Sequence, residues 1–283
     1  MFKSVGIVAR FDRRKAIKLA EETAEYLTKM GLEVYIEDTL KEKLKNKNWN
    51  FIRLENMKTD FIITIGGDGT ILRTCVAIPK PEPPILAINM GVRGFLTEVS
   101  PEMAFNAIDK CLKGDFITEK CAKLSVAYDE RKLPDALNEV LITVGEPVKL
   151  LYARISKNGE HVLDCQADGV MIATPTGSTG YSLSAGGPVL DPSVDAFVLT
   201  PICSLSVLRS IVFPADSKIT VEVLRPKKFL IVIDGAYREV METSNTFITI
   251  TRSKNETTFI RFQENFYNRL KSRLLFRGVG GKI

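Results

Sequence analysis

Phe61-Ile-Ile-Thr-Ile-Gly-Gly-Asp-Gly-Thr-Ile-Leu-Arg73 is the most informative segment of this chain of 283 residues. It opens with an apolar run over Phe61–Ile65, which is typical of a buried strand. The glycines that follow allow a sharp turn and let backbone N–H groups approach a ligand. Thr70–Ile78 has the composition of a helix, whose positive end would point at the same turn. The order of strand, glycine turn and helix therefore predicts a phosphate-binding site.

Asp68 is the carboxylate inside this turn. Near phosphates, a carboxylate can accept the proton of an attacking hydroxyl or hold a divalent cation. Arg73 lies one helical turn further on, where it could face a phosphate. The turn is not a P-loop, because no Lys-Ser or Lys-Thr follows it, and Leu72 replaces the third glycine of the dinucleotide fingerprint. A plain tight turn with Asp68 as a helix cap is the alternative.

Strand and helix patterns alternate on both sides of this segment. The alternation predicts an α/β domain over residues 1–120 with a mostly parallel sheet and helices on both faces. The further strands are expected at Ser4–Ala9, Val34–Ile36 and Pro84–Met90, the helices at Arg13–Met30 and Pro101–Leu112, and a partly helical polar segment at Glu42–Met57.

Strands dominate after residue 120, which predicts a mostly antiparallel β domain over residues 121–262. Asn158-Gly159 favours a tight hairpin turn in it, and Phe247–Thr251 and Thr258–Phe262 are expected as two separate strands. Residues 263–283 are expected to carry a helix, Asn265–Phe276, that packs back on the first domain. Its apolar side would consist of Phe266, Leu270 and Leu274.

Two further segments have the chemistry of a nucleotide site. Asp168-Gly169 and the loop Thr174–Pro188 supply hydroxyls and glycines that suit ribose, phosphate and adenine, and Tyr181 could stack on a base. Asn138-Glu139 pairs an amide with a carboxylate, which can read an adenine amine or ribose hydroxyls. The alternatives are a solvent-exposed loop for the first segment and a polar strand edge for the second.

Composition excludes several classes of protein. The five cysteines form no C-x-x-C pair and His161 is the single histidine, so a zinc site is not expected. This unpatterned set of cysteines is typical of a reducing compartment, and no apolar run reaches 18 residues, so we expect a cytoplasmic protein without a membrane partner. The net charge of +5 favours small polyanions such as nucleotides over nucleic acid.

Four segments together resemble the NAD kinase family in their order and spacing. They are Gly66–Thr70, Asn89–Leu96, Asn138-Glu139 and the loop Thr174–Pro188. A GGDGT turn alone is shared with a wider superfamily that includes lipid kinases and phosphofructokinases, whereas the loop together with Asn-Glu is far more specific. The resemblance covers roughly residues 1–270.

The resemblance implies an α/β N-terminal domain and a C-terminal β-sandwich domain. It implies phosphorylation of the 2′-hydroxyl of the adenosine ribose of NAD, or of NADH, to give NADP, with ATP or another phosphoryl donor. It further implies a divalent cation, with Mg²⁺ expected, and a homodimer or homotetramer.

The roles of individual residues follow from the same resemblance. Asp68 is expected to be the general base, Gly67 and Gly69 to approach phosphates and Arg73 to steady them. Asn138 and Glu139 are expected to hold the nucleoside, and no side chain is assigned as a metal ligand. The remaining expected nucleotide contacts are Phe95, Lys149, Asp168, Thr179, Gly180, Tyr181, Ser182, Leu183 and Ser184.

The chain also departs from the family pattern. Gly180 stands where alanine is usual, Gln166 where a basic residue is common and Ala236 where glutamine is frequent, and Pro201–Arg209 lacks the proline–histidine pair of many members. These differences concern the substrate side, including the choice between NAD and NADH. Two other functions stay open on the residues alone: a kinase for a lipid or sugar hydroxyl, and a non-catalytic dinucleotide sensor.

Overall fold

The computed structural model describes residues 2–45, 48–91, 94–129, 131–145, 149–243, 245–263 and 266–274. It divides into two compact units. Unit 1 comprises Met1–Lys120 and Thr258–Ile283, and unit 2 comprises Cys121–Thr257. Within the part of the chain that the structure describes, no helix combines the length and the apolar character needed to cross a membrane.

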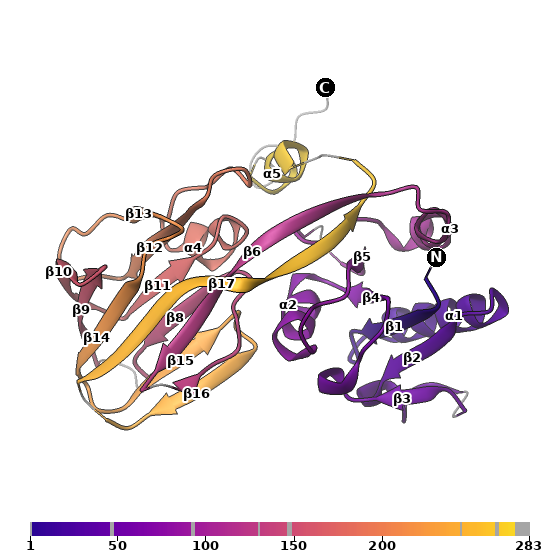
Figure 1. Ribbon diagram of the computed structural model, residues 1–283, viewed down its shortest axis with the longest axis horizontal. Coiled ribbons are helices and arrows are strands. Elements are labelled where there is room, and N and C mark those ends of the chain that lie inside the picture. The colour runs from indigo at the N-terminus through magenta and orange to yellow at the C-terminus, as the bar shows by residue number, and fades with distance from the viewer. Residues whose placement is uncertain are drawn as a thin grey trace. The chain divides into compact units, whose positions relative to one another are not determined.

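A parallel sheet forms the centre of unit 1 (Figure 1). Its strand order is β17-β5-β4-β1-β2-β3, and all of these neighbours pair in parallel. The expected α/β class with a mostly parallel sheet is thereby confirmed. The strands are β1 (Ser4–Ala9), β2 (Glu33–Glu37), β3 (Asn50–Ile52), β4 (Phe61–Gly66), β5 (Ile85–Asn89) and β17 (Thr246–Arg261), of which the last enters the sheet at its end.

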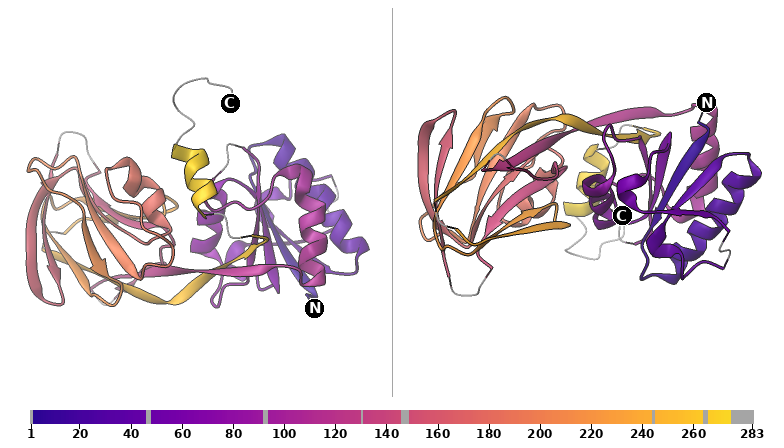
Figure 2. Two further views of the ribbon diagram at one scale, coloured as in Figure 1. Left: turned by 90° about the horizontal axis from the view of Figure 1, so that it is seen from above. Right: turned by 60° about the horizontal axis from the view of Figure 1, so that its bottom comes forward.

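Helices cover both faces of this sheet (Figures 1 and 2). On one face lie α1 (Arg14–Lys29) and α3 (Ala104–Lys113), which share one apolar core with the strands. Tyr26 of α1 donates a hydrogen bond of 2.5 Å to Asp109 of α3. The other face carries α2 (Asp68–Ala77). A short 3₁₀ helix, η3 (Pro101–Met103), precedes α3.

This strand order places the glycine turn at a switch point of the sheet. From β1 the chain continues to β2 on one side, whereas from β4 it continues to β5 on the other side. Open α/β sheets bind ligands at the carboxyl ends of strands where the order reverses in this way. Gly66, the last residue of β4, and the loop that follows Asn89 of β5 lie at that edge.

The segment Glu42–Met57 differs from its prediction. It contains a 3₁₀ turn, η2 (Leu54–Asn56), but also the edge strand β3, while another 3₁₀ turn, η1 (Asp38–Leu40), precedes it. Phe51 packs against the core, and the polar residues around it concealed this strand in the sequence. Asn46 and Lys47 lie outside the described residues.

Unit 2 is a β-sandwich of two antiparallel layers (Figure 1). One layer has the order β13-β12-β11-β8-β15-β16, and the other contains β10-β9-β14-β17. Side chains that alternate along both layers are fully buried, as Ile155, Val221, Ile142 and Ile231 show. The strands are β6 (Ile117–Tyr128), which begins in unit 1, and β7 (Arg131–Lys132), β8 (Glu139–Thr143), β9 (Leu151–Lys157), β10 (Glu160–Ala167), β11 (Gly169–Ala173), β12 (Ala196–Ile202), β13 (Ile211–Pro214), β14 (Ile219–Arg225), β15 (Phe229–Ile233) and β16 (Tyr237–Met241).

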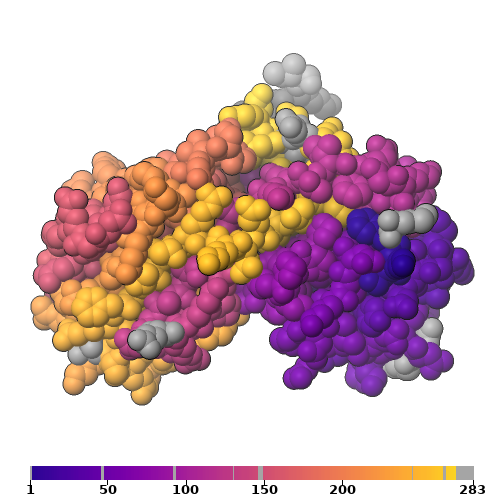
Figure 3. Space-filling view, viewed as in Figure 1, coloured from indigo at the N-terminus to yellow at the C-terminus, as the bar shows by residue number. Residues whose placement is uncertain are grey.

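Two local predictions in unit 2 have different outcomes. The hairpin at Asn158-Gly159 is confirmed, since both residues have positive φ, 54° and 88°, as a type I′ turn requires. The prediction of two separate strands after residue 246 was wrong, because Thr246–Arg261 is one continuous strand. The polar residues between the two apolar runs stay in β17, whose side chains alternate between buried and exposed, and Figure 3 shows its outer face as a yellow band.

The C-terminal part of the chain belongs to unit 1. Thr258–Phe262, predicted within the β domain, lies in unit 1 because Phe259 of β17 pairs with Ile85 of β5. The last helix is α5 (Phe266–Leu274). Its most buried described side chain is Arg269 rather than the expected apolar Phe266 and Leu270, and the side chain of Leu274 lies outside the described part.

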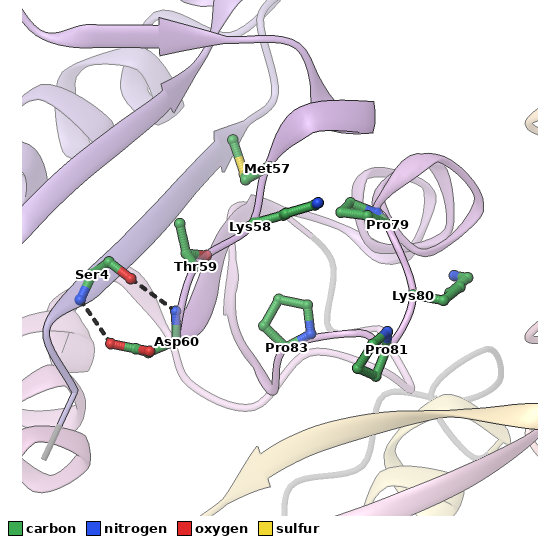
Figure 4. A pocket seen from close by; sticks show the side chains of 9 residues that line it. All are labelled: Ser4, Met57, Lys58, Thr59, Asp60, Pro79, Lys80, Pro81 and Pro83. Carbon is green, nitrogen blue, oxygen red and sulfur yellow. Dashed lines mark hydrogen bonds between the residues drawn. The ribbon is translucent and has the colours of Figure 1, made fainter.

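The opposite edge of the parallel sheet contains a shallow pocket of about 390 Å³. Ser4, Asp60 and Pro83, which lie at or just before the starts of β1, β4 and β5, contribute to its lining (Figure 4). Asp60 accepts hydrogen bonds from the backbone N–H groups of Lys3 and Ser4 there. None of the lining residues belongs to the site predicted from the sequence.

Candidate functional site

The glycines of the GGDGT turn have different surroundings. A Cβ on Gly66 would collide with the side chain of Thr70, so this glycine is required by packing. A Cβ on Gly67 or Gly69 would meet no atom within 4 Å. Gly67 precedes α2, which begins at Asp68. Gly67 and Gly69 therefore leave open space at the first turn of a helix, where backbone N–H groups can bind an anion.

The carboxylate of Asp68 is held by the loop that follows β5. Its Oδ2 accepts a hydrogen bond of 2.9 Å from the backbone N–H of Phe95, and its Oδ1 accepts one of 3.2 Å from that of Leu96. A Cβ on Gly94 would collide with the same carboxylate. Asp68 and the Asn89–Leu96 segment, expected in one site, are thus brought together; Val92 and Arg93 lie outside the described residues.

Two expected ligand contacts in unit 1 have protein partners in the structure. Arg73 forms a two-pronged ion pair with Glu37, in which its Nη2 lies 2.9 Å from Oε2 and its Nη1 is bonded to Oε1. The side chain of Glu37 is 2% exposed, so this pair anchors Arg73 to the end of β2. Phe95 serves Asp68 through its backbone N–H. The phosphate role of Arg73 stays a prediction.

Asp234 organises the Asn138-Glu139 pair in unit 2. Its Oδ2 accepts a hydrogen bond of 2.7 Å from the backbone N–H of Leu137, and its Oδ1 accepts bonds of 2.8 and 3.0 Å from those of Asn138 and Glu139. Asp234 adopts a positive φ of 51° and is buried. Three backbone donors on one carboxylate fix the backbone at the start of β8.

The serine/threonine loop is fastened to the same backbone. The hydroxyl of Thr174 donates 2.6 Å to the carbonyl oxygen of Leu137, and its backbone N–H donates 2.9 Å to that of Asn138. Gly177 has no room for a Cβ, which would collide with the backbone of Asn138. A Cβ on Gly180 would lie 3.3 Å from Nδ2 of Asn138 and 3.5 Å from Oε2 of Glu139. The loop and the Asn-Glu pair therefore form one site.

Two polar atoms in this site lack partners among the described residues. They are Oδ1 of Asn138 and Oε2 of Glu139, both buried. A buried polar atom without a hydrogen bond costs about 1–3 kcal/mol, so such atoms mark a place where a ligand is expected to bind.

The pKa values of the two carboxyl groups in this site, Glu139 and Asp234, are both raised. Burial raises the pKa of Glu139 to about 8, and the nearby charge of Asp234 adds to this effect. Burial also raises the pKa of Asp234, against the opposing effect of its backbone hydrogen bonds and of the Lys123 ammonium. Glu139 is therefore largely protonated at neutral pH, and it can donate as well as accept a hydrogen bond.

The segment from Thr179 to Ser184 contains both buried and exposed members. It forms two short helices, η4 (Gly177–Thr179) and α4 (Tyr181–Ser184), rather than an open loop. Ser182 is fully buried and bonded to Thr200 at 3.0 Å. Its hydroxyl is thus bonded within the protein, and the expected ligand contact of Ser182 stays a prediction. Tyr181 is 46% exposed, while Leu183 and Ser184 are at least partly exposed.

Asp168 and Lys149 lie elsewhere in unit 2. Gly169 of β11 pairs with Thr143 and Ala173 pairs with Glu139, so Asp168 and the Asn-Glu pair are at opposite ends of β11, roughly 15–20 Å apart at about 3.3 Å per residue. Lys149 and Asp168 both lie just beyond the last β9–β10 pair, Leu151 with Ala167. The expected nucleotide contacts of Asp168 and Lys149 stay predictions.

Three residues of the site escaped prediction. Asp234 sits in an Asp-Gly dipeptide, a turn signal that gave no hint of the three backbone donors it binds. Gly94 and Gly177 lie in two segments singled out from the sequence, Asn89–Leu96 and Thr174–Pro188, but no role was assigned to either glycine. Their importance depends on Asp68 and Asn138, which are distant in sequence.

Comparisons with known proteins agree over almost the whole chain. Residues 5–116 match the family of the ATP-NAD kinase N-terminal domain, and residues 137–262 match that of the ATP-NAD kinase C-terminal domain. The NAD kinase of Methanothermobacter thermautotrophicus is 43% identical over 277 residues, 97% of each chain. The NAD kinase of Pyrococcus abyssi is 40% identical over 272 residues, 95% of this chain and 98% of its own.

Two solved structures are also similar. An NAD kinase from Archaeoglobus fulgidus in complex with ATP has a TM-score of 0.78 at 28% identity. The match covers 95% of this chain and 99% of the Archaeoglobus fulgidus chain. Yeast NADH kinase complexed with NADH has a TM-score of 0.88 over 99% of this chain and 89% of its own, and at 24% identity it shows the shared fold. The chain belongs to the NAD kinase family, and it is an enzyme that transfers a phosphoryl group to NAD.

Proposed function

We propose that Asp68 is the general base of this reaction and that the acceptor is the 2′-hydroxyl of the adenosine ribose of NAD or NADH. The observation that supports it most is the position of Asp68 at the first turn of α2, where two backbone N–H groups fix its carboxylate. The fixed oxygen atoms can take the proton of a hydroxyl as it attacks the phosphorus.

The adenosine part of the substrate is proposed to bind Asn138 and Glu139. Their buried Oδ1 and Oε2 lack protein partners among the described residues. A protonated Glu139 offers a donor, and Asn138 offers both a donor and an acceptor, which suits adenine ring nitrogens, the adenine amine and ribose hydroxyls.

The phosphoryl donor is proposed to be ATP, with Mg²⁺ as the divalent cation. The ATP complex of the Archaeoglobus fulgidus relative supports ATP, and the open space beside Gly67 and Gly69 suits phosphates. Among the described residues, no group of three or more His, Cys, Asp or Glu side chains is arranged to hold a metal. This fits Mg²⁺, which usually binds through substrate phosphates, water and one or two carboxylates; when bound, it neutralises phosphate charge.

We further propose a homo-oligomer that acts in the cytoplasm. All five cysteines are free thiols, and four of them are buried, which suits a reducing compartment. The segment between β12 and β13 exposes Leu205 and Val207 by 67% and 89%, as a contact surface for a second copy would. Size-exclusion chromatography coupled to light scattering measures the mass of the assembly. A monomer at micromolar concentration would contradict the proposed homo-oligomer.

The activity itself is tested by incubating the purified protein with ATP, Mg²⁺ and NAD and detecting NADP with an NADP-specific dehydrogenase. Parallel reactions replace NAD by NADH, or ATP by polyphosphate. We expect NADP with ATP as donor. Absence of product from both acceptors with both donors would overturn the proposal.

A further inference from the structure

Arg261 lies under the loop that holds Asp68. It is the last residue of β17, and its side chain is 4% exposed. Its Nη1 donates a hydrogen bond of 2.9 Å to the backbone carbonyl oxygen of Leu96. The backbone N–H of the same Leu96 donates to Oδ1 of Asp68. One residue, Leu96, thus connects the buried guanidinium to the carboxylate in two hydrogen bonds.

The guanidinium is held in its orientation by acidic side chains. Its Nε donates 2.6 Å to Glu119, and its Nη1 also donates 3.2 Å to Glu98. Glu98 in turn accepts the backbone N–H of Phe262 at 2.9 Å, and Arg269 of α5 lies 3.7 Å from both carboxylates. The charges of Arg261 and Arg269 therefore balance those of Glu98 and Glu119. Three N–H groups of Arg261 donate to three different acceptors, which fixes the orientation of the guanidinium.

The loop is fastened on its other side by β5. The backbone N–H of Glu98 donates 2.8 Å to the carbonyl oxygen of Ala87, and that of Asn89 donates 2.8 Å to the carbonyl oxygen of Val99. The carbonyl oxygen of Leu96 belongs to the 96–97 peptide, and the hydrogen bond from Arg261 fixes its direction. The N–H and the carbonyl group of Leu96 flank the same Cα, so a fixed carbonyl group restrains the backbone from which this N–H donates to Asp68.

We propose that Arg261 is a positioning residue for Asp68: it fixes the Leu96 peptide so that the N–H groups of Phe95 and Leu96 aim the carboxylate at the hydroxyl to be phosphorylated. This inference rests on the proposed role of Asp68 as the base. A buried ion network stabilises a fold little better than apolar side chains of similar volume do. The arrangement around Arg261 supplies a directional donor for one carbonyl oxygen, which apolar side chains cannot supply.

Arg261→Lys is the first test variant. Lysine keeps the positive charge next to Glu98 and Glu119, but its compact ammonium lacks the planar fork that reaches three separate acceptors. We expect the turnover number to fall about tenfold, as for a small displacement of a reacting group, with the Michaelis constants for NAD and ATP within about twofold of the wild type. The matched control is Glu119→Gln, which removes one charge of the network but keeps an amide oxygen that can accept the Nε bond, so Arg261 keeps its orientation and turnover should stay within about twofold.

A double-mutant cycle with Asp68→Asn separates the two proposals. If Arg261 acts through Asp68, Arg261→Lys should slow the wild type about tenfold and the Asp68→Asn variant less than twofold. An equal tenfold loss in both backgrounds overturns the positioning role while the base assignment stands. Turnover of Asp68→Asn near the wild-type value overturns the base assignment itself. Wild-type turnover of Arg261→Lys overturns the positioning role alone.

A second variant covers the case in which Arg261→Lys does not fold. Arg261→Gln combined with Glu119→Gln removes one charge of each sign and leaves Arg269 and Glu98 as a balanced pair. We expect the same tenfold loss relative to Glu119→Gln alone, and the same loss of effect in the Asp68→Asn background. Turnover equal to that of Glu119→Gln contradicts the inference.

Discussion

The carboxylate of Asp68 fills the space in which a Cβ on residue 94 would lie, so Gly94 and Asp68 fit together as a pair. Gly94 has no positive φ between +20° and +160°, so backbone conformation alone would tolerate alanine there. What alanine would displace is the carboxylate, together with its bonds to Phe95 and Leu96.

Gly94→Ala should therefore strongly reduce activity although Asp68, the proposed base, is not itself substituted. We expect turnover to fall by roughly 100-fold, in the range that general-base catalysis contributes, while the far-UV circular dichroism spectrum stays that of the wild type. The matched control is Gly91→Ala in the same loop, where a Cβ would meet no atom within 4 Å. Equal activity of the two variants would show that the position of the Asp68 carboxylate does not limit the reaction.

Gly69→Ala should separate stability from activity. Gly69 is the second residue of α2, and a Cβ would enter open space. Alanine in a helix is more favourable than glycine by up to about 1 kcal/mol, so the thermal midpoint should rise. If phosphates occupy that space, kcat/KM for ATP should fall about tenfold or more. A stabilised variant with unchanged kcat/KM would place the phosphates elsewhere.

Asp234→Asn tests how the nucleoside site is held. The carboxylate of Asp234 accepts hydrogen bonds from the backbone N–H groups of Leu137, Asn138 and Glu139. In the variant, the amide nitrogen would face one or more of these N–H groups and could not accept a bond from them. Loss of an acceptor for buried donors costs about 1–3 kcal/mol, and we expect KM for NAD to rise about tenfold with a smaller change in turnover. Asp216→Asn, at an exposed position of the same unit, is the control. The same KM in both variants would contradict the role of Asp234.

Glu139 should make the stability of the ligand-free protein depend on pH. Its pKa is raised from 4.5 to about 8 by burial and by Asp234, so between these values the folded state holds a proton that the unfolded state releases. The free energy of unfolding should therefore fall as pH rises from about 4.5 to 8 and then level off. Each pKa unit corresponds to about 1.4 kcal/mol.

Glu139→Gln removes this titration. Urea unfolding of the variant and the wild type at pH 5 and pH 8 measures the difference, which should favour the variant more at pH 8. Glu160→Gln, at an exposed hairpin position, should show no such change. A difference between Glu139→Gln and the wild type that is the same at both pH values would mean that Glu139 titrates normally in the folded protein.

Local patterns were enough to predict a parallel α/β unit followed by a mostly antiparallel β unit, whereas the sandwich arrangement of the second unit was implied by the family resemblance. The alternation of apolar and amphipathic segments around Phe61–Gly66 predicted the parallel sheet, and Asn158-Gly159 predicted its hairpin. The continuous strand Thr246–Arg261 was missed, because a strand that serves two units has a polar middle that resembles a loop.

The site was predictable where chemistry is carried by residue type, and not where it depends on contact across the fold. Asp68, Asn138 and Glu139 could be found from motifs. Asp234 and Arg261 could not, because each acts on the backbone of a residue more than 90 positions away, as the bonds to Asn138 and Leu96 show. Burial of Ser182 against Thr200 was equally invisible in a run of serines and glycines.

The most direct test of the central proposal is the turnover of Asp68→Asn with NAD, measured together with the dissociation constant for NAD. Asparagine occupies nearly the same volume but cannot take a proton from the ribose hydroxyl. We expect turnover to fall by roughly 100-fold or more, in line with the loss of a general base, while the dissociation constant changes less than about threefold. Turnover close to that of the wild type, with NADP still formed, would contradict Asp68 as the base.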